Sequence, residues 1–454
     1  MLETNAEILR AEMMDVVRLF GDVPPVTHTF FCEGDNFINR VCVNGREYSF
    51  SERQPYCGEI EFKRYARRFA KLAVYEALRA ETGKSMPWGA LTGIRPTRLA
   101  YAELDAGRPF EPLFERMRVS ADNIALVRDV IAGQKAVYER REGNCDLFVS
   151  LPFCPTKCEY CSFITAPIAA TRKYLPGYLS ALKEELAAAG PLIGNLRSVY
   201  IGGGTPLVLE PAQLRRVLVA ATPFAAECGE YTVEAGRPDV FTREKLDLLK
   251  EFSVTRVCVN PQTFCDATLE RIGRKHTSED IYRAFALARE YAFDINCDLI
   301  AGLTGESTEE FEESVDRAVA LSPENITVHT LCLKKGARLK EEESRLCVAG
   351  ISDMIAYARE KLSRAGYVPY YLYRQKYMAG NCENTGWTKP GKACVYNVDV
   401  MEEITDNIAC GANAVGKKLY PKEGRIERVG APKDIPTYLQ KIHALIEEKN
   451  KLYR

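Results

Sequence analysis

Short apolar runs rich in β-branched residues alternate with longer amphipathic segments between about residues 146 and 331. Six runs have the length and composition of buried strands: 146–153, 197–204, 230–236, 255–262, 294–302 and 325–331. The segments between them show the period of an amphipathic helix, and one begins with a capping box from Ser307 to Glu310. Strands that alternate with helices predict a parallel α/β sheet with right-handed crossovers. Six such units favour a partial (β/α)6 barrel, and an open doubly wound sheet is the alternative.

The segments on either side of this core have a different pattern. The N-terminal part combines two strand-like runs with a long amphipathic stretch from about 62 to 80, which predicts an α+β region. After the core, the helical period recurs at 352–365 and 435–449 and predicts a mostly helical extension. We therefore expect three parts: an α+β region at 1–143, a core at 144–331, and a substrate or cap region at 332–454.

Composition narrows the class of protein. The chain has 454 residues, 46% of them hydrophobic, which is enough for a sizeable core and two or three domains. A formal net charge of -1 argues against a nucleic-acid-binding protein. No apolar run reaches the roughly 18 residues of a membrane helix, and the N-terminus lacks the features of a secretory signal. These observations predict a cytoplasmic protein whose 16 cysteines are mostly thiols.

Three cysteines stand close together directly after the first core strand. Cys154, Cys158 and Cys161 are separated by three and then by two residues. Thiolates are preferred ligands of iron–sulfur clusters and of zinc. A structural zinc site needs four ligands, and no partnering pair follows nearby. Three thiolates on a [4Fe-4S] cubane leave one iron open to a small molecule, so we expect such a cluster here; zinc with a distant fourth ligand, or incidental cysteines, are the alternatives.

A glycine-rich motif follows the second core strand. It consists of Gly202, Gly203, Gly204, Thr205 and Pro206. In a (β/α) barrel the carboxyl ends of the strands gather the functional loops. Glycines at such a place let the backbone approach a ligand closely, although a tight turn explains them as well.

Four polar residues follow at or near the ends of the later strands. Glu234 lies within the third strand, where a buried carboxylate is costly unless it is paired. Gln262 ends the fourth strand and Arg274 follows twelve residues later. Asp298 lies in the fifth strand. Each could be a strand-end cap or part of a structural ion pair, but their shared edge makes them candidate site residues.

The cysteine spacing, with Tyr160 as the aromatic residue before the third cysteine, resembles the signature of the radical S-adenosylmethionine (SAM) superfamily. This resemblance implies that SAM chelates the open iron and is cleaved by one electron to give a 5′-deoxyadenosyl radical. The order of Glu234, Gln262, Arg274 and Asp298 resembles the oxygen-independent coproporphyrinogen III oxidase (coproporphyrinogen dehydrogenase) family. LTGIRPTR in the N-terminal part and the later YYLYRQK resemble its HemZ-type branch.

The resemblance implies a reaction and a set of site residues. The reaction is oxidative decarboxylation of coproporphyrinogen III propionates to vinyl groups, giving protoporphyrinogen IX in haem biosynthesis. Gly204 and Glu234 would contact the cluster-bound SAM. The residues that would line a second SAM site are Tyr160, Thr205, Pro206, Gln262, Arg274 and Asp298. A flavodoxin- or ferredoxin-type electron donor, an anaerobic setting and a monomer are also expected.

A tetrapyrrole with four propionates needs apolar walls and several cations. Arg374 is the preferred candidate for a propionate contact, and with Gln262 and Arg274 it completes the expected catalytic set. The other candidates are Arg95, Arg98, Lys334, Lys335 and Lys376, with Tyr370, Tyr371 and Tyr373 as flat surface for a macrocycle.

Two positions depart from the pattern of the family. Phe148 replaces a frequent tyrosine, and Phe163 replaces a fourth cysteine of the best-studied oxidases. Relatives without that cysteine include haem-trafficking proteins, so a haem-binding chaperone is one alternative function. His276 or His329 could then bind haem iron. Another radical SAM reaction on a tetrapyrrole is the second alternative.

Overall fold

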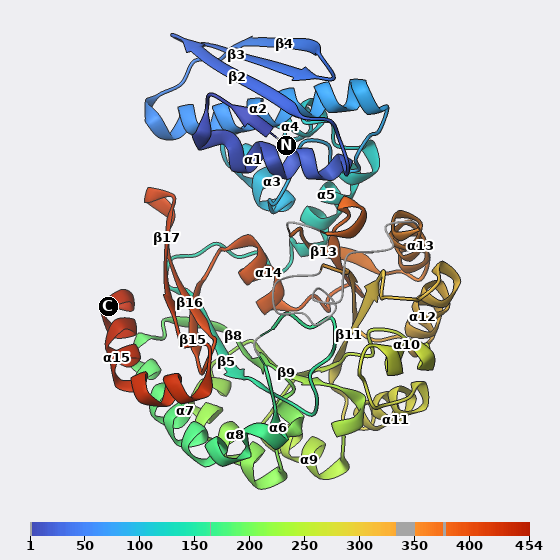
Figure 1. Ribbon diagram of the computed structural model, residues 1–454. Helices are drawn as coiled ribbons and strands as arrows, with labels where there is room; N and C mark the ends of the chain where they lie inside the picture. The colour runs from blue at the N-terminus through green and yellow to red at the C-terminus, as the bar shows by residue number, and fades with distance from the viewer. Residues whose placement is uncertain (1, 164, 333–349, 376–377) are drawn as a thin grey trace. The chain divides into compact units, whose positions relative to one another are not determined.

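The computed structural model describes residues 2–163, 165–332, 350–375 and 378–454 (Figure 1). The chain divides into two compact units. The N-terminal unit is Met1–Arg128 with Tyr373–Glu383, and the barrel unit is Asp129–Leu372 with Asn384–Arg454. The units do not follow the three expected segments, because most of the C-terminal segment pairs directly with the strands of the core.

The N-terminal unit is built of a four-stranded sheet and helices, as the pattern predicts. Its sheet has the order β1 (Leu2–Thr4), β2 (Val26–Glu33), β3 (Asn36–Val43) and β4 (Arg46–Arg53). Its helices are α1 (Glu7–Val17), α2 (Gly58–Thr82), α3 (Pro96–Asp105) and α4 (Glu111–Arg116), with α5 (Ala121–Gln134) leading into the barrel unit. Phe37, Val41 and Val43 alternate along β3 and are fully buried, so this face of the sheet forms the core against α2.

Six parallel strands form the centre of the barrel unit and confirm the partial (β/α)6 barrel. They are β5 (Asn144–Leu151), β8 (Asn195–Gly203), β9 (Glu230–Gly236), β10 (Arg256–Val259), β11 (Asp294–Ala301) and β12 (Asn325–Thr330). The helices between them are α6 (Ile168–Thr171), α7 (Leu175–Ala189), α8 (Pro211–Ala225), α9 (Arg243–Glu251), α10 (Asp266–Arg271), α11 (Ser278–Arg289) and α12 (Thr308–Leu321). The longer of these helices cover the outer face of the strands (Figure 1).

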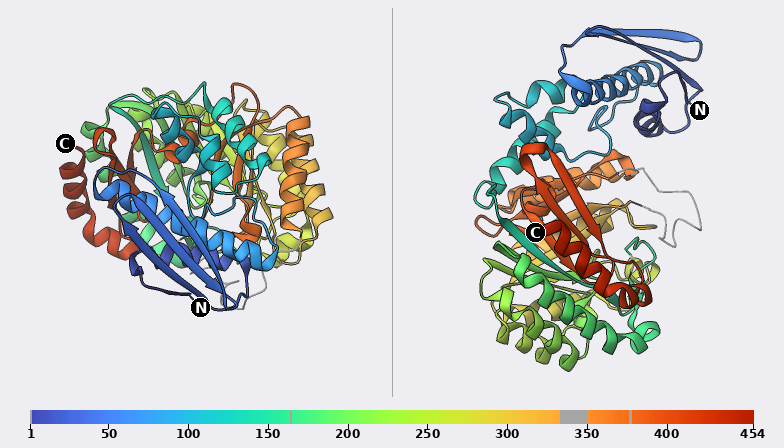
Figure 2. Two further views of the ribbon diagram at one scale, coloured as in Figure 1. Left: turned by 90° about the horizontal axis from the view of Figure 1, so that it is seen from above. Right: turned by 90° about the vertical axis from the view of Figure 1, so that its left-hand side faces the viewer.

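Strands of the C-terminal segment extend both edges of this sheet. β15 (Asp406–Cys410) pairs with β5 and continues into β16 (Val415–Tyr420) and β17 (Arg425–Gly430). At the other edge, β14 (Asn384–Thr388) pairs with β12 and is followed by β13 (Val368–Tyr373). The helices of this segment are α13 (Ile351–Arg364), α14 (Val395–Glu402) and α15 (Ile435–Tyr453), of which α15 packs along α7 and β17 (Figure 2). The extension is therefore mixed rather than mostly helical.

The amino-terminal ends of the core strands are closed by the segment before and within α14. Arg256 and Asn325, the first residues of β10 and β12, donate hydrogen bonds of 3.0 and 2.8 Å to the carbonyl oxygen of Lys392. The Cys394 thiol donates to the Glu230 carboxylate at the start of β9, over 3.1 Å. Because this end of the barrel is filled, the carboxyl ends of the strands are left for a site.

No helix among the described residues has both the length and the apolar composition needed to cross a membrane.

Candidate active site

The three cysteines lie on one loop at the carboxyl end of β5. After Pro152 a two-residue strand, β6 (Phe153–Cys154), pairs with β7 (Ala166–Pro167), so the loop between them is closed at its base. Within the loop, the amide of Cys161 donates to the Cys158 carbonyl oxygen over 3.1 Å. Burial raises the pKa of the Cys161 thiol to about 11. The loop thus presents three thiols from one short, folded turn.

The described part of the chain holds no group of three His, Cys, Asp or Glu side chains arranged around a single metal ion. A zinc site would require such convergence on one point. A cubane is ligated through several irons, so its thiolates are spread over a larger object. Cys154, Cys158 and Cys161 lie on one loop and supply the thiolate ligands that iron–sulfur clusters and zinc both use.

The glycine motif packs directly against the cysteine loop. The amide of Thr205 donates to the Phe153 carbonyl oxygen over 2.7 Å, and the Thr205 hydroxyl lies 3.6 Å from the Cys154 sulfur. A Cβ atom on Gly204 would lie 2.5 Å from the Phe153 oxygen, which is closer than real Cβ contacts allow. Gly204 is therefore required for the close approach of these two backbones.

Glu234 lies beside the glycine motif, with Asp298 and His329 on nearby strands. Its carboxylate accepts a 3.2 Å hydrogen bond from the Gly203 amide. Burial, and then the charge of Asp298, raise the pKa of Glu234 to about 8. Asp298 on β11 lies 3.8 Å from the ring of His329 on β12. These polar side chains from β9, β11 and β12 lie toward the same end of the barrel as the cysteine loop.

Gln262 and Arg274 complete the group of predicted polar residues. Gln262 has a φ of 73°, and its backbone bridges to β11 through its amide on the Asp298 oxygen and its oxygen on the Ile300 amide, both 2.9 Å. Arg274 donates to the Asn260 carbonyl oxygen over 2.6 Å and to the Tyr160 hydroxyl over 3.0 Å. The structure thereby connects Arg274 to Tyr160, the aromatic residue before Cys161.

Several buried polar atoms around this loop have no protein partner among the described residues. They are Asn260 Oδ1, Gln262 Oε1 and Arg274 Nε. Buried polar atoms are normally hydrogen-bonded, and an exception needs a missing partner. A ligand with amino, carboxylate, hydroxyl and purine groups offers both donors and acceptors. The side chains at this end of the barrel therefore fit a cluster with bound SAM.

Comparison with known proteins agrees with this geometry. The sequence profile of the radical SAM superfamily matches residues 148–318. The oxygen-independent coproporphyrinogen-III oxidase-like protein HemZ of Bacillus subtilis is 35% identical over 392 residues, which cover 82% of this chain and 78% of HemZ. The chain belongs to this HemZ-like family. Radical SAM proteins use a [4Fe-4S] cluster and SAM, and these are the cofactors of this family member.

Other relatives of this HemZ-like protein are named as heme chaperones. Heme chaperone HemW of Bacillus subtilis is 35% identical over 193 residues, 41% of this chain and 50% of HemW. HemW of Escherichia coli is 27% identical over 296 residues, 62% of this chain and 72% of HemW. Among solved structures, the coproporphyrinogen III oxidase HemN of Escherichia coli, a radical SAM enzyme, has a TM-score of 0.51 and 20% identity, covering 68% of this chain and 71% of HemN. HemN therefore shares the fold.

The guanidinium of Arg374 is bound by oxygens of the protein. It belongs to the N-terminal unit and is only 6% exposed. Its guanidinium donates to the carbonyl oxygens of Leu91, Cys382 and Asn381 and to the Asn381 side chain, and it lies 5.1 Å from the Trp88 ring centre. Four of its five N–H groups are therefore bound, and the predicted propionate contact has no support in this geometry.

The other predicted substrate residues have different surroundings. Arg95 and Tyr373 are partly exposed, and Arg98 is exposed. The lysines Lys334, Lys335 and Lys376 lie outside the described residues. Tyr370 and Tyr371 are buried in β13, and the Tyr371 hydroxyl bonds to Thr327 at 2.8 Å. These two tyrosines are core residues of the HemZ-like fold.

The two departures from the family pattern have different surroundings. Phe148 stacks with Tyr200 and Tyr396 at ring-centre distances of 6.2 and 6.1 Å. Phe163 is 69% exposed, two residues after Cys161. The aromatic ring of Phe148 thus serves packing inside the barrel, whereas Phe163 extends from the cysteine loop.

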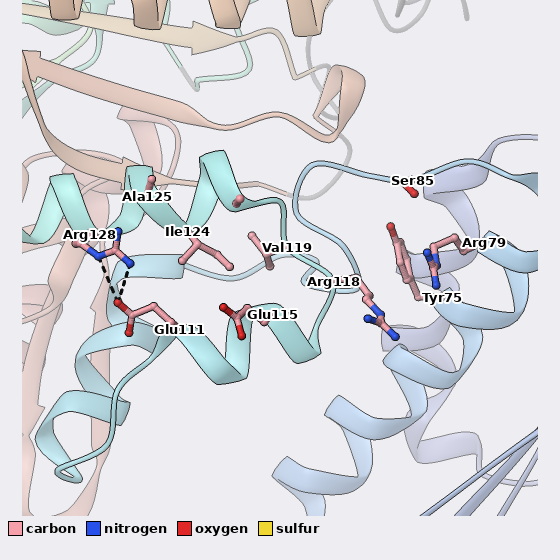
Figure 3. Close-up of a pocket in the computed structure, with 11 residues that line it drawn as sticks. Tyr75, Arg79, Ser85, Glu111, Glu115, Arg118, Val119, Ile124, Ala125 and Arg128 are labelled. Carbon is pink, nitrogen blue, oxygen red and sulfur yellow. Dashed lines mark hydrogen bonds and ion pairs between the residues drawn. The ribbon is translucent and has the colours of Figure 1, made fainter.

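A pocket of about 550 Å³ lies in the N-terminal unit and contains none of the predicted site residues (Figure 3). Its cations are matched by acids: Arg128 bonds to Glu111 at 3.0 Å, and Arg79 bonds to Glu76 at 2.9 Å. We therefore place the chemistry of this radical SAM protein at the cysteine loop and not in this pocket.

Sequence reasoning missed Arg237 and Thr156. Arg237 directly follows β9, and its guanidinium donates to the hydroxyl of Thr156 inside the cysteine loop. Its place at the carboxyl end of a barrel strand was a signal for its importance. The contact with Thr156 joins positions 81 residues apart, and the sequence contains no sign of it.

Proposed function

We propose that the protein is a radical SAM oxidoreductase that decarboxylates propionate side chains of coproporphyrinogen III to vinyl groups. The observation that carries this proposal is the packing of the cysteine loop, the glycine motif and Glu234 against one another at the open end of the barrel. The similarity to HemZ of Bacillus subtilis, over 78% of that protein, supports the choice of substrate.

The residues at the carboxyl end of the barrel strands would have different roles in binding the cluster and SAM. Cys154, Cys158 and Cys161 would hold the cluster and leave one iron open. When bound, the cluster and SAM supply a 5′-deoxyadenosyl radical by one-electron cleavage of the sulfonium. The backbone of the glycine motif and the Glu234 carboxyl group would orient the SAM amino group, because a nearby ammonium favours the ionised form of this carboxyl group and then pairs with it.

A second set of residues would bind further SAM. It consists of Tyr160, Thr205, Pro206, Gln262, Arg274 and Asp298. Of these, Gln262 and Arg274 each have a buried polar atom without a hydrogen-bond partner among the residues that the structure describes, so both can bind a ligand without breaking a hydrogen bond seen there. The Asp298 carboxylate suits a ribose hydroxyl.

The proposal is tested with anaerobically reconstituted protein, SAM, a strong reductant and coproporphyrinogen III. We expect 5′-deoxyadenosine and vinyl porphyrinogens, identified by mass spectrometry. Cys158→Ala should abolish the iron–sulfur absorbance and both products. The matched control is Cys297→Ala, because Cys297 is fully buried in β11 away from the loop and its substitution should leave all three in place. Deoxyadenosine without a vinyl product would overturn the decarboxylation and leave the radical chemistry standing.

A haem-binding function on the same scaffold is the second candidate. It is supported by the similarity to the heme chaperones HemW and by the pairing of His329 with Asp298, because a carboxylate beside an imidazole orients it as a metal ligand. Haem titration followed by the Soret band separates the two functions. Haem binding that is lost in His329→Ala, without SAM turnover, would favour the chaperone.

A further inference from the structure

A buried arginine stands behind the cysteine loop. Arg237 follows the last residue of β9 and is 3% exposed. Its Nε and Nη2 atoms donate to the two oxygens of Asp239 over 2.9 and 2.7 Å. Such a two-pronged pair fixes the plane of a guanidinium, which a lysine cannot reproduce.

The third nitrogen of this guanidinium points at the loop. Arg237 Nη1 donates to the hydroxyl of Thr156, which in turn donates to the Gly273 carbonyl oxygen over 3.2 Å. Thr156 stands midway between Cys154 and Cys158. The position of these two sulfurs therefore depends on the Thr156 hydroxyl, which accepts a hydrogen bond from Arg237 and donates one to Gly273.

A histidine ring lies beside the carboxylate of the pair. The ring of His276, whose side chain is 0% exposed, lies 3.7 Å from Asp239. A second link between the same segments runs from the Glu159 amide to the Ile272 carbonyl oxygen, at 3.1 Å. The cysteine loop is thus attached to the turn at 272–273 at two points, and one of them is the Thr156 hydroxyl that Arg237 also contacts.

The positive and negative ends of the Arg237–Asp239 ion pair face different parts of the structure. Its cation contacts the cysteine loop through Thr156, and its carboxylate lies on the side of His276. Inside a protein, where the effective dielectric constant is low, such an oriented pair acts on a nearby charge even though its net charge is zero. The charge of an iron–sulfur cluster changes by one on reduction, so its potential responds to this orientation.

We propose that Arg237 is a positioning residue of the cluster site, which holds Thr156 between two cluster cysteines and directs positive charge toward their thiolates while Asp239 balances it. The inference rests on the proposed ligation by the three cysteines and is independent of the tetrapyrrole. Neither Arg237 nor Asp239 would touch SAM or substrate.

The two partners should change the cluster in opposite directions. Arg237→Gln removes the cation and leaves the carboxylate, so the reduction potential should become more negative. Asp239→Asn leaves the cation unbalanced, so the potential should become more positive. If the pair only held the loop in place and had no electrostatic effect, the reduction potentials of Arg237→Gln and Asp239→Asn would shift in the same direction. Arg237→Lys keeps the charge without the fork and should hold the potential closer to that of the wild type.

The experiment is a potentiometric titration of the anaerobic holoprotein, followed by the electron paramagnetic resonance of the reduced cluster. Arg215→Gln is the matched control, because Arg215 forms a fork with Glu251 that is half exposed on the surface. Circular dichroism checks that each variant folds, and Asp239→Asn, with its expected positive shift, carries the test where Arg237→Gln does not fold.

A second measurement needs no cofactor. Hydrogen exchange of the amides at 156–162 in the apoprotein should be faster in Arg237→Gln and Thr156→Val, and unchanged in Thr156→Ser, which keeps the hydroxyl. Unchanged exchange, or potentials that shift in the same direction in both charge variants, would overturn the inference. Failure of the wild type to assemble a cluster would instead overturn the proposed function.

Discussion

Arg274 Nη2 lies 3.0 Å from the hydroxyl of Tyr160, so the arginine that follows the fourth core strand holds the aromatic residue between Cys158 and Cys161. The same guanidinium reaches the Asn260 carbonyl oxygen at the end of that strand. One side chain therefore connects the cysteine loop to the barrel wall.

Substitution of Arg274 tests this connection. In Arg274→Lys a single ammonium cannot reach both Asn260 and Tyr160 in the same geometry. We expect the rate of 5′-deoxyadenosine formation to fall about tenfold or more, which corresponds to about 1.4 kcal/mol in the barrier. Tyr160→Phe, which keeps the ring, should have a smaller effect. Arg271→Lys, at the end of α10, is the control from the same segment. An unchanged rate in Arg274→Lys would argue against the connection.

Glu234 should make the stability of the apoprotein depend on pH. Its pKa of about 8 in the folded state lies above the ordinary value of 4.5, so the folded protein holds the proton more tightly than the unfolded chain. The stability contributed by the protonated group is present below pH 4.5 and is lost as pH rises toward and through 8. Relative to the wild type, Glu234→Gln should gain up to about 4 kcal/mol between pH 5 and pH 9.

Thermal unfolding at several pH values measures this difference. Asp298→Asn serves as the companion variant, because removing the neighbouring charge should lower the pKa of Glu234. The pH range over which stability is lost should then shift to lower pH. A constant difference between Glu234→Gln and the wild type from pH 5 to pH 9 would contradict the raised pKa.

Gly204 should not tolerate a side chain. In Gly204→Ala the new methyl group would lie 2.5 Å from the Phe153 oxygen and 2.7 Å from the Leu151 oxygen, both of them backbone atoms. The cysteine loop would have to shift, so we expect less iron per chain after reconstitution. Gly190→Ala is the matched control, since nothing lies within 4 Å of its added Cβ atom. Equal iron content in the two variants would show that the contact does not position the loop.

Arg374 should act on stability and not on substrate binding. Arg374→Gln leaves buried carbonyl oxygens such as those of Leu91 and Asn381 without their donor, which costs roughly 1–3 kcal/mol for each group. We expect a loss of about 2–4 kcal/mol in the free energy of unfolding, measured in urea. Arg128→Gln, on the surface of the same unit, should cost at most about 1 kcal/mol. Wild-type stability with a raised KM would instead support a propionate contact.

The sequence pattern predicted the strands correctly, and it also predicted the loops that follow them and carry the candidate site residues. The six apolar runs gave the six parallel strands in order, and the loops after the first two strands carry the cysteines and the glycine motif. The close approach of Thr205 to Phe153 follows from this order, because neighbouring parallel strands end at the same edge.

Other features depend on contacts between distant positions. The first core strand, β5, pairs with β15 from the C-terminal segment, although their sequences are more than 250 residues apart. Arg374 reads as a candidate cation in the sequence, but its guanidinium is bound by Leu91 and Asn381. Contacts between residues far apart in the sequence leave no periodic pattern of apolar and polar positions, so they could not be predicted from the sequence.

The sequence by itself determined the repeating strands and helices, the cysteine spacing and the polar residues at the strand ends, because these depend on neighbours along the chain and on the order of strands. Only the tertiary structure decided which charged residues stay available for a ligand. The guanidinium of Arg374 is bound by carbonyl oxygens, and that of Arg237 is bound to Thr156 and Asp239. Arg274 has one nitrogen without a hydrogen-bond partner in the described part of the chain. Burial and hydrogen bonding across long sequence separations set this difference, since the chemistry of the three side chains is the same.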